Sequence, residues 1–92
     1  MRLKRRVRWI VCSPPGYTFI DYGFRRKPKL ITNAELREIN GKPGGGYSFS
    51  DGAVFLRSQA AWRFFDKLPT GAVIEKDIRT QRGWFEEKAW SQ

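Results

Sequence analysis

The sequence contains no histidine, so it lacks the commonest general base and a common metal ligand. Its single cysteine, Cys12, can form neither an internal disulfide nor a structural zinc site of thiolates. The apolar stretch after the basic N-terminus, residues 7–12, is interrupted by Arg8 and is too short for a signal-peptide core or a membrane span. Glu35 and Glu38 form the one carboxylate pair at helical spacing, and their position favours the start of a helix over acid–base chemistry. We therefore expect a non-enzymatic protein of the cytoplasm, with no cofactor, no metal and no membrane partner.

Aromatic and apolar residues are abundant despite the small size of the chain. Apolar residues make up 40% of the 92 positions and aromatic residues 15%, including four Trp and seven Phe. A disordered basic tail would not carry so much bulky apolar material. This length supports one hydrophobic core, so we expect residues 1–92 to form a single domain.

Positive charge is concentrated in the first half of the chain. The net charge is +9, of which residues 1–46 contribute +8 (eleven Lys or Arg against three carboxylates) and residues 47–92 contribute +1. A one-sided excess of this kind indicates a polyanionic partner, while a basic surface without a specific partner is the alternative.

The amino-terminal segment has the alternation of a half-buried strand. Over residues 3–12 the odd positions are mostly apolar, with Trp9 expected in the core, and the even positions from Arg2 to Arg8 are cationic. A turn over residues 13–16 leads into a second aromatic-rich strand over residues 17–24. If these two strands form a hairpin, the basic runs before and after it meet at one end of a sheet.

This basic N-terminal hairpin is the candidate binding site. Tyr17 and Tyr22 either stack on unpaired bases or belong to the core, and Lys42 lies in a glycine-rich loop that is either a linker or a backbone contact. The loop does not match a phosphate-binding pattern, because Pro43 follows Lys42. The expected nucleic-acid-binding residues are Arg2, Lys4, Arg6, Arg8, Tyr17, Tyr22, Arg25, Arg26, Lys27, Lys29 and Lys42.

The remaining elements follow from capping and turn signals. Thr32 and Glu35 have the spacing of a capping box before a short helix, and Ser58 is placed to cap a longer helix ended by Pro69. Asp51-Gly52 is a hairpin signal between strands over residues 47–50 and 53–57. Residues 72–79 read as a strand, while residues 83–90 fit either a helix or a final strand paired with it. The pattern predicts an α+β fold: an antiparallel sheet of four to six strands, one main helix over about residues 59–68 and a short helix over about residues 33–40.

In overall profile the chain resembles small phage-encoded inhibitors of bacterial machinery, among them anti-CRISPR proteins. The resemblance rests on the length of 92 residues from Met1, the lack of a catalytic set, the dense arginine and aromatic content, and the basic runs at residues 2–6 and 25–27. It implies a protein of the bacterial host cytoplasm that sits on an RNA-guided complex, touches guide RNA and protein together, and blocks target hybridisation.

The sequence thus predicts a non-enzymatic binder of RNA, single-stranded nucleic acid or a ribonucleoprotein complex, acting through the basic hairpin. The alternative is a protein-binding inhibitor or adaptor without nucleic-acid contact, for which arginine and tryptophan anchors are equally suited. A duplex DNA regulator is a third reading, although the main helix offers only Arg63 and Lys67 to a major groove.

Overall fold

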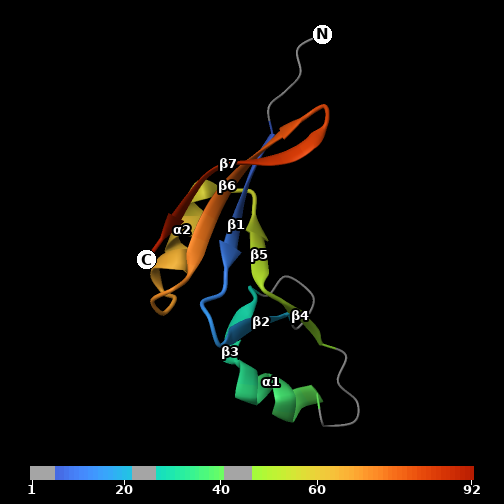
Figure 1. The fold of residues 1–92 in the computed structure, drawn as a ribbon, viewed down its shortest axis with the longest axis vertical. Helices are drawn as coiled ribbons and strands as arrows, with labels where there is room; N and C mark the ends of the chain where they lie inside the picture. The colour runs from blue at the N-terminus through green and yellow to red at the C-terminus, as the bar shows by residue number, and fades with distance from the viewer. Residues whose placement is uncertain (1–5, 22–26, 41–46) are drawn as a thin grey trace.

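The computed structural model describes residues 6–21, 27–40 and 47–92, which form an elongated body of 52 × 28 × 21 Å (Figure 1). Two antiparallel sheets, one of four strands in the order β5-β1-β6-β7 and one of three in the order β3-β2-β4, are combined with two helices. The α+β fold class is therefore confirmed, with the strands divided between two sheets. In chain order the elements are β1 Arg6–Cys12, β2 Tyr17–Asp21, β3 Lys29–Thr32, α1 Asn33–Asn40, β4 Ser48–Ser50, β5 Gly52–Phe55, α2 Ser58–Asp66, β6 Val73–Thr80 and β7 Gly83–Ser91.

The expected hairpin between the first two strands is wrong. Strand β1 pairs with β5 and β6, whereas β2 pairs with β3 and β4 in the other sheet. The connecting turn contains Pro14 and Pro15, which have no backbone N–H to donate to a ladder. Pro14 is fully buried, and the chain crosses at this point from one sheet to the other. The hairpin therefore cannot bring the two basic runs together.

The expected hairpin at Asp51-Gly52 is also wrong, because β4 and β5 belong to different sheets. The two-residue turn that this dipeptide favours needs a positive φ at glycine, and Gly52 is not among the described glycines with positive φ. Its lack of a side chain serves packing instead, since a Cβ there would lie 3.1 Å from Cγ2 of Ile10. The carbonyl of Asp51 accepts a hydrogen bond from the backbone N–H of Ser13 at 2.9 Å, which joins the two crossover points.

Helix α2 packs on one face of the four-stranded sheet and completes the core. Ala61 and Phe65 of the helix are buried against Trp9, Val11 and Ile74 of the sheet. Trp9 is 9% exposed, as expected for a core residue, and its ring lies 6.1 Å from that of Trp62 and 5.9 Å from that of Trp90.

Phe64 of the same helix connects the two sheets. Its ring lies 5.5 Å from Phe19 of β2 and 5.1 Å from Phe55 of β5, measured between centroids. Phe19 is 1% exposed and belongs to the same core cluster as the residues of the four-stranded sheet. A single aromatic cluster therefore holds both sheets.

The helix starts show one confirmed and one wrong capping prediction. Before α1, the backbone N–H of Thr32 donates to Glu35 Oε1 at 3.2 Å, and the N–H of Glu35 donates to Thr32 Oγ1 at 3.1 Å. This is the predicted capping box. For α2 the residue before the helix is Arg57 rather than Ser58, and no side chain caps the first turn.

The carboxyl-terminal segment adopts the strand that was one of its two predicted conformations. Strand β7 pairs with β6 along its length, with a bulge at Glu87 opposite the step from Lys76 to Asp77. Within the described residues no helix has the length and apolar character to cross a membrane.

Candidate nucleic-acid interface

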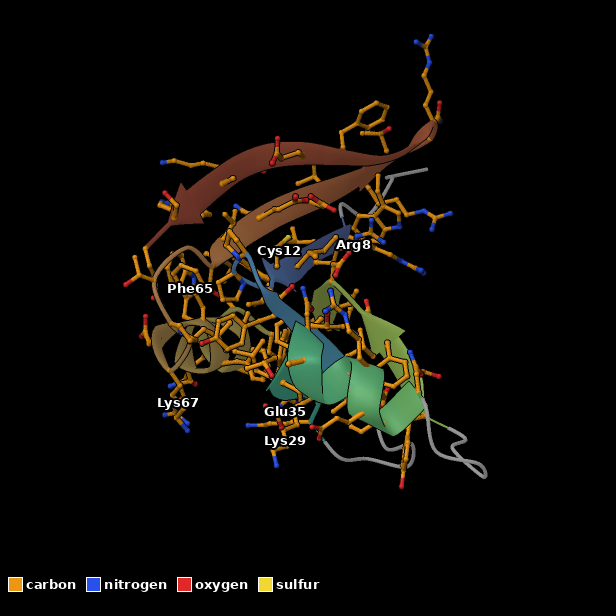
Figure 2. All side chains as sticks on the ribbon, turned by 60° about the horizontal axis from the view of Figure 1, so that its bottom comes forward. Arg8, Cys12, Lys29, Glu35, Phe65 and Lys67 are labelled. Carbon is orange, nitrogen blue, oxygen red and sulfur yellow. The ribbon has the colours of Figure 1, made fainter. Side chains whose placement is uncertain are left out.

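The structure separates the predicted site residues that it describes. Arg6 and Arg8 lie on β1 at one end of the four-stranded sheet, whereas Lys29 belongs to β3 in the other sheet and pairs with Ile20. Figure 2 shows Arg8 and Lys29 in different halves of the molecule. The other predicted residues, Arg2, Lys4, Tyr22, Arg25, Arg26 and Lys42, lie outside the described residues.

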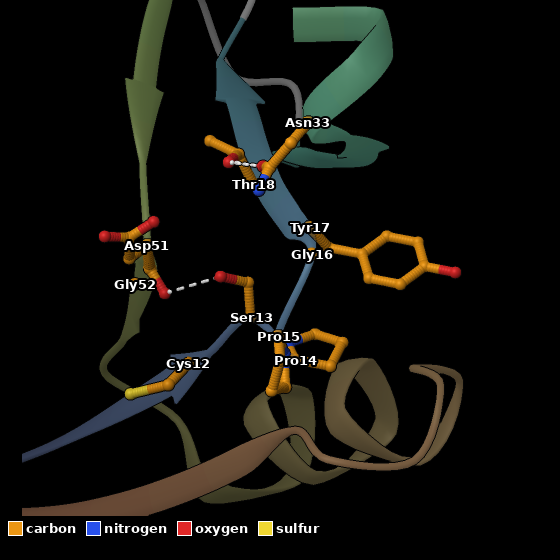
Figure 3. A pocket seen from close by; sticks show the side chains of 10 residues that line it. All are labelled: Cys12, Ser13, Pro14, Pro15, Gly16, Tyr17, Thr18, Asn33, Asp51 and Gly52. Atoms are coloured by element: carbon orange, nitrogen blue, oxygen red, sulfur yellow. Dashed lines mark hydrogen bonds between the residues drawn. The ribbon is translucent and has the colours of Figure 1, made fainter.

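Lys27 and Tyr17 do not join Arg6 and Arg8 either. Lys27 is exposed just before β3. Tyr17 is half-buried and lines a shallow hollow of about 420 Å³ between the turns before β2 and β5. Figure 3 shows its ring pointing away from the side chains of Asp51 and Cys12, which line the same hollow. The polar groups of this hollow bond to one another, since Ser13 Oγ donates to the Asp51 carbonyl and Thr18 Oγ1 donates to Asn33 Oδ1.

Strand pairing brings different cations to Arg6. Arg6 is paired with Arg79 on β6, and Arg79 is paired in turn with Trp84 on β7. Residues directly opposite each other in a ladder project to the same face, so these three side chains form one row across the sheet. Arg6 and Arg79 are exposed, and Trp84 is half-buried.

The next residues along the strands add an oriented guanidinium. Arg8 lies on the same face as Arg6, two residues further along β1, and its guanidinium carbon is 4.3 Å from the ring centroid of Trp84. That of Arg79 is 5.9 Å from the same ring. Arg82 is also exposed and lies in the turn between β6 and β7, at the same end of the sheet. We call the set Arg6, Arg8, Arg79, Arg82 and Trp84 the Arg/Trp end.

Arg8 is not a free cation, which corrects the expectation of an evenly available row of charges on β1. Its Nε donates to Oδ2 of Asp77 at 3.0 Å, and the side chains of Arg8 and Asp77 are 28% and 6% exposed. A single bond through Nε leaves the two terminal nitrogens of the guanidinium for another acceptor. Asp77 therefore holds Arg8 in place and neutralises part of its charge.

Three residues of the Arg/Trp end were not predicted as site residues. Arg79, Arg82 and Trp84 are far from Arg6 in the sequence and reach it only through the pairing of β1 with β6. The strand predicted as one alternative for residues 83–90 could have indicated part of this set, because a hairpin with β6 places Trp84 opposite Arg79. Partners for β1 so distant in sequence could not be read from its alternation.

Within the described part of the chain, no group of three or more Cys, Asp or Glu side chains is placed to hold a metal ion. Burial, followed by the negative charges of Glu75 and Asp77, raises the pKa of the Cys12 thiol, the opposite of the shift that activates a nucleophilic thiolate.

Comparison with known proteins identified no relative of this chain. No family model matches the chain, and neither a curated protein nor a solved structure was found to match it.

Proposed function

We propose that this protein binds single-stranded nucleic acid, RNA in the first place, alone or within a ribonucleoprotein complex, through the Arg/Trp end. The observation that carries the proposal is the Arg8 guanidinium stacked 4.3 Å from Trp84, beside the exposed Arg6 and Arg79. Aromatic rings next to cations are the usual platform for unpaired bases, with stacking worth about 1–3 kcal/mol per base. The predicted hairpin is thus replaced by a different set of residues with the same chemistry.

The balance of charge at this end favours a polyanion. Arg6, Arg79 and Arg82 are exposed. The adjoining row holds Asp77, which is engaged with Arg8 and almost fully buried, and the exposed Glu86, so the exposed cations outnumber the exposed carboxylate. Each phosphate that a cation neutralises releases condensed counterions, and for single strands the slope of log K against log salt is about −0.7 per contact. Three contacts would give a slope of about −2.

A charge-reversal experiment tests the proposal. Affinity for labelled single-stranded RNA, single-stranded DNA and duplex DNA is measured by fluorescence anisotropy over a salt series. The site variant carries Arg6→Glu and Arg79→Glu. The matched control carries Arg63→Glu, in α2, and Lys67→Glu, directly after α2; both cations are exposed. Both variants change the net charge equally, so only a local site distinguishes them.

The expected result is tight, salt-sensitive binding of single strands by the parent and the control, with a loss of at least tenfold in the site variant. Equal losses in both variants would show that total charge alone attracts the nucleic acid. Preference for duplex DNA together with a larger loss in the α2 variant would support the duplex reading instead.

As a narrower proposal, the protein uses the Arg/Trp end as an inhibitor of the anti-CRISPR kind in a bacterial cytoplasm. A reducing compartment suits a chain with one cysteine. Capture of host proteins with and without nuclease tests it. Capture that disappears with nuclease supports a ribonucleoprotein target, whereas capture that survives nuclease, by a variant that no longer binds RNA, supports the protein-binding alternative.

A further inference from the structure

The face of the four-stranded sheet opposite α2 has no covering layer among the described residues. Helix α2 packs on β1, β5 and β6 at the face that holds Trp9, and α1 contacts β2 and β3 (Figure 1). On the other face, one register row runs through Val54, Ile10, Glu75 and Ala89 on four successive strands. We call this surface, with the neighbouring row of Arg8, Asp77 and Glu86, the open face.

The open face exposes apolar side chains at its β5 edge. Val54 is 60% exposed, although a valine in a sheet usually buries its side chain. Leu56, two residues after Val54, is 80% exposed. Ile10, which is paired with Val54, is half-buried. The solvated face of an antiparallel sheet is usually polar, so exposed apolar side chains beside a half-buried isoleucine are unusual there.

Next to this strip the open face is acidic, in a protein whose net charge is +9. Glu75 and Asp77 lie two residues apart on β6, and Glu86 is paired with Asp77 across to β7. Among the described residues these three carboxylates make one ion pair, in which Arg8 bonds a single oxygen of Asp77. The other oxygen, Oδ1, is buried and accepts no hydrogen bond from the described residues.

The environment of Glu75 agrees with this excess of negative charge. Burial, a hydrogen bond with Asp77 and the charges of Asp77 and Glu86 raise the pKa of Glu75, and Arg8 opposes only part of the rise. A cation brought to this position would relieve the repulsion among the three carboxylates.

We propose that the open face is a docking surface for a partner protein that presents an apolar segment flanked by lysine or arginine. The apolar side chains of the partner would cover Ile10 and Val54, and its cations would pair with Glu75 and Glu86. This interface goes beyond the proposed function, because it lies further along the same sheet face than Arg6, Arg79 and Trp84, shares only Arg8 with the Arg/Trp end, and needs no nucleic acid. It is compatible with a ribonucleoprotein target, since proteins that bind RNA carry cationic surfaces.

The charge pattern decides between possible occupants. A nucleic acid would be repelled by three carboxylates that share one guanidinium. A second copy docked so that the two acidic strips meet would bring like charges together across the interface, which is costly. A cationic, partly apolar protein segment satisfies both halves of the surface.

The test uses a designed helical peptide of leucine and lysine with one apolar face, and the same peptide with glutamate in place of lysine. Binding of each labelled peptide is measured by anisotropy, and the contacted residues are located by amide chemical-shift changes. The site variants are Val54→Ser, and Glu75→Gln combined with Glu86→Gln. The matched control combines Glu38→Gln with Asp66→Asn, which removes two exposed carboxylates from the helices.

The expected result is that the lysine peptide binds and shifts the amides of Ile10, Val54, Glu75 and Ala89, and that each site variant weakens it about tenfold while the control does not. The glutamate peptide should not bind. The proposal is overturned if the lysine peptide does not bind, if the control weakens it as much as the site variants, or if the glutamate peptide binds equally well. It is also overturned if the parent dimerises and Val54→Ser abolishes the dimer, because the occupant would then be a second copy.

Discussion

Arg8 and Asp77 face each other on the neighbouring strands β1 and β6, and the Nε of Arg8 donates to Oδ2 of Asp77 at 3.0 Å. The arginine is partly exposed and stacks on Trp84, whereas the aspartate is 4% exposed. The pair therefore joins the interior of the sheet to the surface that we propose binds nucleic acid. Its two members should respond differently to substitution.

We expect Arg8→Met to destabilise the fold more than Asp77→Asn. Removing the guanidinium leaves a buried carboxylate without its partner, at a cost of about 3 kcal/mol in the free energy of unfolding. Asp77→Asn removes the charged partner of Arg8, whose side chain is 28% exposed and can be solvated by water instead, so this substitution should cost about 1–2 kcal/mol. Urea unfolding of both variants and of the double variant measures this, and the double variant should cost less than the sum. A larger loss of stability in Asp77→Asn than in Arg8→Met would contradict this account, because it would mean that the unpaired arginine is costlier than the unpaired aspartate.

Glu75 should make the protein less stable near neutral pH than in mild acid. Burial and the neighbouring carboxylates raise the pKa of Glu75 above that of the unfolded chain, so the folded protein holds this proton more tightly. Stability from the proton is complete below the unfolded pKa, about 4.3, and is lost as the pH rises through the folded pKa.

Glu75→Gln should therefore raise the melting temperature at pH 7 and leave it unchanged at pH 4. The control is Glu87→Gln, which removes a carboxylate 3.7 Å from Lys76 Nζ and should give no gain at either pH, because an exposed ion pair contributes only about 0–1 kcal/mol. A loss of stability on Glu75→Gln at pH 7 would contradict this account.

The success of sequence reasoning follows the range of the interactions. The capping box of Thr32 and Glu35 was predictable because its partners are three residues apart and need no tertiary context. The pairing of Ile10 with Val54 joins residues more than forty positions apart and was not predictable. The alternation along β1 shows which side chains share a face, but it does not show which strands pair with β1. The same limit explains the site, because Arg79 and Trp84 become neighbours of Arg6 only in the assembled sheet.

Substitution by alanine should cost more at Gly83, in β7, than at Gly52, in β5. Gly83 has φ +122°, a conformation that side chains rarely adopt, so Gly83→Ala should cost about 1–3 kcal/mol and disturb the turn directly before Trp84. At Gly52 the added Cβ would lie 3.1 Å from the Cγ2 methyl group of Ile10, a half-buried side chain that can shift, and 4.0 Å from the carbonyl oxygen of Val11, an ordinary contact. The backbone of Gly52 is not among those with positive φ. Gly52→Ala should therefore stay within about 1 kcal/mol, partly offset by the lower entropy of the unfolded chain. Denaturant midpoints of the two variants check the difference, and a larger cost at Gly52 would mean that Ile10 is held rigidly.

Trp84 and Phe85 offer a matched test of base stacking, because adjacent residues of β7 project to opposite faces. Trp84 shares its face with Arg79 and Arg6, whereas Phe85 shares the other face with Ile78 and is 49% exposed. If bases stack on the Arg/Trp end, Trp84→Ala should weaken binding of a single strand by about 1–3 kcal/mol, and Phe85→Ala should leave it unchanged. Tryptophan fluorescence gives a second readout, since quenching by the bound strand should largely disappear in Trp84→Ala and persist in Phe85→Ala. Retained affinity in Trp84→Ala, with an unchanged salt dependence, would mean that the arginines hold the backbone without any contact to the bases.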